Sequence, residues 1–222
     1  MKKETNYLWS TALFVTIVIS HQSFSQMKMS TTKTTLETEA CVSSLDTKMR
    51  QLWEEHVVWT RNVILCLVDE LPGTDQAVKR LLQNQVDIGN VFKPYYGEDA
   101  GNKLTEILKV HINVSAEVVK AAKAGNTNAF NEANKRWYAN ADQLSEFLCK
   151  VNTGWVLEDM KKMMKEHLKI TTDEAEQRIK KNYDADVFAF DKINYEILIM
   201  ADMLADGIVK QFPEKFTTVT VK

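Results

Sequence analysis

Three histidines occupy equivalent settings in this 222-residue sequence. His56, His111 and His167 each follow two apolar and two variable residues, and each precedes an apolar, a variable and an apolar residue and then Ser or Thr. The first two are 55 residues apart and the last two are 56 apart, a period typical of duplicated helical hairpins. Three imidazoles placed alike could bind a transition metal, because neutral imidazole is a common ligand of zinc, copper and iron.

Aspartates follow two of these histidines at one fixed distance. Asp87 comes 31 residues after His56, and Asp142 comes 31 residues after His111. If each hairpin turns between its two helices, each aspartate lies within about one helical turn of its histidine. Carboxylates and imidazoles on facing helices are the usual ligands of metal centres in helical bundles.

The third copy of the pattern departs from the other two. Asp186 follows His167 by only 19 residues, and a turn expected near residue 170 places His167 level with Glu174. Asp186 therefore cannot meet His167 within that hairpin, although His167 could face residues of one of the other two hairpins in the same chain. The predicted metal ligands are His56, His111, His167, Asp87, Asp142 and Asp186.

The same residues have two other interpretations. A histidine flanked by apolar residues and facing an aspartate can be a buried hydrogen-bonded pair that fixes the register of two helices. A metal with an open coordination position could also support catalysis. The Glu-x-x-His motif of ferritin-like dimetal bundles is absent, since the residues three positions before the histidines are Trp53, Leu108 and Met164. All three interpretations stay open at this point.

Other polar and aromatic residues are candidates for binding a ligand or a partner. Two tyrosines follow Lys93 and Pro94 in a predicted turn, where they could contact a partner or close the end of the bundle. Two tryptophans at helical spacing could line a ligand cavity, although such residues more often belong to the core. The candidate binding residues are Tyr95, Tyr96, Asn84, Asn140, Trp59 and Trp137.

The composition predicts an all-α protein. Glycine (7) and proline (3) are scarce in a chain that is 45% hydrophobic and 26% charged, which favours long helices joined by few turns. Helical periodicity and turn residues predict an antiparallel bundle of about six helices, built from repeated helical hairpins. The expected helices are 44–71, 75–92, 98–124, 128–151, 156–169 and 172–210.

The first 25 residues have the pattern of a secretory signal peptide. Lys2 and Lys3 form a short basic region, and an apolar stretch from Tyr7 to Ile19 follows. This stretch is shorter than the ~20 apolar residues of a membrane-spanning helix, and small residues precede Gln26 at the positions that define a cleavage site. We expect cleavage before Gln26 and a periplasmic or secreted protein; the alternative is an uncleaved anchor.

The chain after residue 25 divides into three parts. Residues 26–42 are rich in Thr, Ser, Lys and Glu and are expected to form a flexible lead-in. Residues 43–213 are expected to form the helical domain, and residues 214–222 a frayed tail. The net charge of −2 and the absence of a Lys/Arg cluster give no reason to expect a nucleic acid as partner. We also expect no membrane span in the mature form.

Several short motifs resemble an uncharacterised family of bacterial all-helical proteins, over about residues 48–213. They include Glu55-His-Val-Val-Trp-Thr-Arg61, Lys93-Pro-Tyr-Tyr-Gly97, Trp137-Tyr-Ala-Asn-Ala-Asp142 and Glu166-His-Leu-Lys-Ile-Thr171. Some members of that family carry automated labels such as acetylglutamate kinase or glycosyltransferase. The sequence supports neither activity, because it has no glycine-rich phosphate loop and no alternation of strands with helices.

The leading functional hypothesis is a non-enzymatic, exported binding or interaction domain. The alternative is a metal-binding bundle that uses the three histidines and the facing aspartates, and that could be a metalloenzyme. The first hypothesis predicts that replacing the histidines lowers only stability. The second predicts a stoichiometric transition metal that is lost on replacement.

Overall fold

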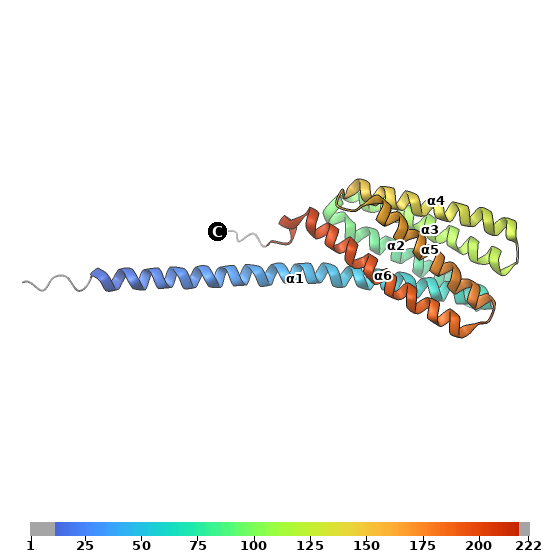
Figure 1. The fold of residues 1–222 in the computed structure, drawn as a ribbon, viewed down its shortest axis with the longest axis horizontal. Coiled ribbons are helices and arrows are strands. Elements are labelled where there is room, and N and C mark those ends of the chain that lie inside the picture. The colour runs from blue at the N-terminus through green and yellow to red at the C-terminus, as the bar shows by residue number, and fades with distance from the viewer. Residues whose placement is uncertain (1–11, 218–222) are drawn as a thin grey trace, which may run out of the picture. The chain divides into compact units, whose positions relative to one another are not determined.

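The computed structural model describes the backbone of residues 12–217 and the side chains of residues 38–217. These residues form six α-helices and one short 3₁₀ helix, with no strand (Figure 1). The prediction of an all-α bundle of six helices is therefore confirmed. The helices are α1 (Ala12–Asp69), α2 (Thr74–Tyr96), α3 (Glu98–Lys123), α4 (Thr127–Val151), α5 (Leu157–Ile179) and α6 (Tyr183–Gln211), and the 3₁₀ helix is η1 (Pro213–Lys215).

The contacts divide the chain into two units, of which Ser44–Pro213 is the helical bundle. Within the bundle, α2 packs on α3, α3 on α4, α4 on α5, and α5 on α6. Hydrogen bonds join α1 to α2, for example from Asn84 to the carbonyl of Leu52 at 2.9 Å. Short turns between consecutive helices make these neighbours antiparallel, as Figure 1 shows for α3 and α4.

Helix α1 begins at Ala12, well before the predicted start at residue 44. It includes residues 26–42, which were expected to form a flexible lead-in. No glycine or proline precedes Pro72 in the sequence, so no residue with a strong helix-breaking tendency interrupts this stretch. The predicted signal peptide lies partly outside the described residues, and it stays a prediction. No helix in the described part of the chain is long and apolar enough to cross a membrane.

The predicted boundary between the last two helices is wrong. The sequence Thr171-Thr-Asp-Glu174 was expected to cap a new helix, but α5 continues through it to Ile179. The hydroxyls of Thr171 and Thr172 instead donate to the carbonyls of His167 and Leu168, one turn earlier in the same helix. Ser and Thr often make this bond inside helices. Helix α2 also runs further than predicted, through Pro94 to Tyr96, and stops at Gly97.

Three of the turns share one conformation. Glu70, Gly125 and Lys181 each have a positive φ, of 56°, 64° and 59°. In each turn the next residue donates its N–H to the carbonyl five positions back, as in a Schellman motif. Positions 70, 125 and 181 each come 14 residues after one of the three histidines. Each histidine therefore lies at the same distance along its helix from the following turn, in three successive helix pairs.

Candidate functional site

The three histidines lie in the middle of the bundle, on α1, α3 and α5. His56, His111 and His167 are only 3%, 3% and 4% exposed. The Nδ1 atom of each contacts a polar side chain on the next helix, and in each case the partner comes 29 residues later. The pairs are His56 with Gln85 (3.3 Å), His111 with Asn140 (2.9 Å) and His167 with Glu196 (3.0 Å).

The second pair has every polar atom satisfied. His111 Nδ1 donates to Asn140 Oδ1, which leaves Nε2 to accept a hydrogen bond from Trp137 Nε1 at 3.1 Å. The amide of Asn140 donates in turn to the carbonyl of Ile107 at 3.2 Å. An imidazole with one donor and one acceptor in use is neutral. This network ties α3 to α4 at one register.

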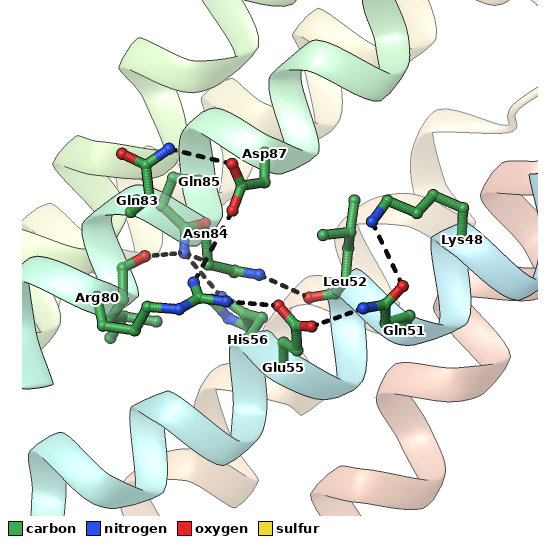
Figure 2. Close-up of polar contacts among 11 residues, drawn as sticks. Lys48, Gln51, Leu52, Glu55, His56, Arg80, Gln83, Asn84, Gln85 and Asp87 are labelled. Atoms are coloured by element: carbon green, nitrogen blue, oxygen red, sulfur yellow. Dashed lines mark hydrogen bonds and ion pairs between the residues drawn. The ribbon is translucent and has the colours of Figure 1, made fainter.

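In the first pair, two adjacent residues make the two contacts that Asn140 makes alone in the second pair. Gln85 contacts His56, and Asn84 donates to the carbonyl of Leu52 (Figure 2). Leu52 precedes His56 by four residues, just as Ile107 precedes His111. In both hairpins, an amide therefore binds the histidine and an amide binds the carbonyl one turn earlier.

The imidazoles lie close to one another in a region without water-facing surface. The ring centroids of His56 and His167 are 5.9 Å apart, and the ring of Trp53 lies edge-on to His56 at 5.7 Å. Burial lowers the pKa of His56 well below its usual value, and repulsion from His167 and His111 adds to this effect. Burial and repulsion from His167 lower the pKa of His111 to about 3. Both rings are neutral at physiological pH.

The predicted pairing of histidines with aspartates is wrong. Asp87 accepts a hydrogen bond from Gln83 and lies 3.9 Å from Arg80, as Figure 2 shows, while Asp142 lies 3.8 Å from Lys165. Each aspartate comes two residues after the true partner of its histidine. Two residues turn a helix by about 200°, so these carboxylates point away from the histidines, to positions where they are partly exposed.

The predicted metal centre also has no counterpart among the described residues. In this part of the chain no three His, Cys, Asp or Glu side chains lie together in a group that could hold a metal ion. The three Nδ1 atoms each bind a different partner within their own helix pair. The arrangement matches the interpretation in which the histidines fix the register of the hairpins.

Asp186, the last predicted ligand, belongs to a buried ion-pair network. Arg61 Nη1 lies 2.6 Å from Glu174 and 2.7 Å from Asp186, and both carboxylates are only 1% exposed. Arg178 approaches the other oxygen of Asp186 at 3.4 Å, and it also pairs with Asp69. The guanidinium of Arg61 rests over the ring of Phe190 at 4.8 Å. This network joins α1, α5 and α6.

Only Asp186 of this network was predicted as a site residue, and the most buried of the others is Glu174. It is buried beside Asp186, and burial raises its pKa to about 7 although Arg61 lowers it. Glu174 and Arg61 come 7 and 5 residues after their respective histidines, so they lie between one and two helical turns beyond the histidines. Glu174 is a charged residue at a position of α5 that faces the core. This could not be recognised from the sequence because the helix was predicted to end at residue 169.

The predicted binding aromatics divide into two groups. Tyr95 and Tyr96 pack on Phe212, with ring centroids 6.0 and 5.1 Å away, and Asn152 donates to the hydroxyl of Tyr96 at 2.9 Å. These contacts place the two tyrosines at one end of the bundle, which they close. Trp59 lies beneath Arg80, whose guanidinium is 5.5 Å from the indole ring.

A small apolar cavity of about 20 Å³ lies one helical turn beyond the histidines. Thr60, Ser115 and Thr171, the hydroxyl residues of the repeated pattern, line it together with Trp137. Their hydroxyls donate to carbonyls of their own helices, at 2.7, 2.8 and 2.9 Å. The rest of the lining is mostly apolar, so the cavity can hold an apolar group without leaving a polar atom unpaired.

A second hollow, of about 330 Å³, opens to solvent beside this cavity. It lies between the α3–α4 turn and the end of α5, and Ala122, Phe130 and Glu176 line both spaces. Asn126 and Lys180 also line the open hollow. We call the two spaces together the α3–α5 cleft. Its lining is mostly apolar, and it includes the carboxylate of Glu176 where the two spaces meet.

No protein-family model matches the sequence, and no curated protein or solved structure matches it either. The resemblance to a bacterial helical family therefore stays a prediction from the motifs.

Proposed function

We propose that the chain is a non-enzymatic, exported binding domain, and that its ligand is a small apolar molecule held in the α3–α5 cleft. The observation that carries this proposal is that a small, mostly apolar cavity lies next to an open hollow, with three lining residues in common. Ligand sites are typically concave and mostly apolar, with a few polar groups that orient the ligand. Export rests on the signal-peptide pattern of residues 1–25.

The dimensions of the cleft define the class of ligand. The open hollow, at about 330 Å³, is within the range of small-molecule sites, roughly 300–1,000 Å³. The inner cavity, at about 20 Å³, has space for a single small group. A ligand would place an apolar end against Phe130 and Ala122. Its polar end would meet Asn126 and Lys180, which line the open hollow but not the inner cavity.

The histidine pairs support this proposal indirectly. The residues four positions after the histidines, Thr60, Ser115 and Thr171, form part of the cavity lining. Because the three pairs fix the register of the helices that carry these residues, they also set the shape of the cavity. This assigns the histidines a structural role and leaves binding to the apolar lining.

Binding of the apolar fluorescent probe N-phenyl-1-naphthylamine tests the proposal. We expect saturable fluorescence enhancement with the full chain, and at least a tenfold weaker affinity for Ala122→Phe, since the larger side chain fills the junction of the two spaces. Ala139→Phe is the matched control, because Ala139 lies exposed on α4 outside the cleft. The proposal fails if the parent shows no saturable binding, or if Ala122→Phe binds the probe as well as the control does.

A further inference from the structure

Helix α6 carries apolar residues on its outer face as well as on its inner face. Among the described side chains, nine large hydrophobic residues are exposed, and five of them belong to α6. The most prominent are Phe188 (60% exposed), Tyr195 (71%) and Ile199 (49%). The inner face of the same helix buries Ile193, Ile197 and Leu204 completely or nearly so.

The exposed residues form one continuous stripe. Phe188, Tyr195 and Ile199 are spaced by seven and four residues, the spacing with which one helix packs along another. Asp191 and Lys192 are exposed between Phe188 and Tyr195. Asp191 forms no ion pair within the described part of the chain, and Lys192 Nζ lies over the ring of Phe188 at 4.3 Å. We call these five residues the α6 stripe.

At the centre of the α6 stripe, from Phe188 to Tyr195, the order of residues is complementary to itself when reversed. If a second α6 lies antiparallel, with a twofold axis between positions 191 and 192, position i faces position 383 − i. Phe188 then faces Tyr195 of the other copy, and Asp191 faces Lys192. Each of these contacts occurs twice, as in any isologous interface. Ile199 lies outside this matched centre and faces Asp184 of the other copy.

We propose that the α6 stripe is a self-association surface, on which a second copy of the chain packs antiparallel through α6. Charge complementarity is the reason for choosing this occupant. A parallel pair in register would set Asp191 against Asp191 and Lys192 against Lys192, whereas the antiparallel pair opposes unlike charges at its centre. Opposed charges of this kind select partner and orientation more than they add affinity. The surface shares no residue with the α3–α5 cleft, so the two proposals stand or fall separately.

Charge exchange combined with light-scattering mass measurement tests the proposal on the full chain. The parent should elute with twice the chain mass at micromolar concentrations. Asp191→Lys places four cationic groups at the centre of the interface, and Lys192→Asp places four carboxylates there, so each single variant should be monomeric. An equimolar mixture of the two variants should form a heterodimer, because lysines of one copy then face carboxylates of the other.

Tyr195→Ser and Glu132→Ser provide an apolar test and its control. Tyr195→Ser should weaken the dimer at least tenfold, and Glu132→Ser, at an exposed position on α4, should leave it unchanged. Far-ultraviolet circular dichroism shows whether each variant is folded. A parent that stays monomeric up to about 100 μM overturns the proposal. So does a dimer that persists in both charge variants, or a mixture of folded variants that forms no heterodimer.

Discussion

Replacing Arg61 by Met should lower the free energy of unfolding by roughly 3–5 kcal/mol, because the change leaves two buried carboxylates without their shared cation. Glu174 and Asp186 both lie within 2.7 Å of Arg61 Nη1 and are almost completely buried. Chemical denaturation at pH 7.5 measures the effect. Met keeps an apolar side chain of similar length but loses the contact of the guanidinium with the Phe190 ring, so the loss reports on the charge and on this contact together.

Arg50 offers a matched control for this substitution. It also pairs with an aspartate on α6, Asp202, at 2.8 Å, but both side chains are 48% exposed. Exposed ion pairs typically contribute less than ~1 kcal/mol, so Arg50→Met should have a small effect. Arg61→Met combined with Glu174→Gln should recover part of the lost stability. Equal losses in the free energy of unfolding for Arg61→Met and Arg50→Met would show that the buried network stabilises the protein no more than an exposed ion pair does.

Lowering the pH from 7 to 4 should destabilise the bundle through its histidines. In the folded protein the pKa of His111 is about 3, against an ordinary value of 6.5. Between these two values the unfolded chain binds the proton and the folded chain does not, so the free energy of unfolding falls as the pH drops below 6.5. Carried down to pH 3, this single group accounts for roughly 4–5 kcal/mol. His56, whose pKa is also well below normal, acts in the same direction.

Glu174 works in the opposite direction over part of the same range. Its pKa is raised to about 7, so the folded protein takes up this proton first, and its contribution to stability grows as the pH falls from 7 towards 4.5.

A comparison with His111→Gln separates the two effects. This variant should be less stable at pH 7.5 by about 1–3 kcal/mol, since Trp137 and Asn140 lose a partner.

The dependence on pH is the decisive part of that comparison. Below about pH 5.5 the parent should lose about 1.4 kcal/mol more per pH unit than His111→Gln, the equivalent of one proton. Denaturant titrations at half-unit steps of pH from 7.5 to 4 provide the slopes. Parallel slopes for parent and variant would mean that His111 is already accessible to protons in the folded state.

The sequence predicted most of the fold because the turns that contain glycine or proline are visible in it. Pro72-Gly73, Gly97, Gly125 and Gly154 separate the first five helices, and the structure places turns at all of them. The turn between α5 and α6 contains neither residue. Lys181 takes the left-handed conformation there, which costs a non-glycine side chain energy and has no compositional signal.

This single misplaced turn explains why the third hairpin looked irregular. With the turn near residue 170, His167 had no partner in its own hairpin. With the turn at 181, His167 meets Glu196 at the same 29-residue separation as the other two pairs. The partners were also misjudged by two residues in the first two hairpins. The position of the turn determines which part of the next helix lies opposite each histidine. The direction of each side chain around the helix axis then decides which residue of that part faces the histidine.

Elemental analysis by mass spectrometry, on the full chain purified without chelator or affinity metal, tests most directly whether the three histidines are structural. The comparison is with a His56→Gln, His111→Gln, His167→Gln triple variant. We predict no stoichiometric transition metal in either protein, and a folded but less stable variant. Near-stoichiometric metal in the parent, absent from a folded variant, would contradict the account and make the histidines ligands.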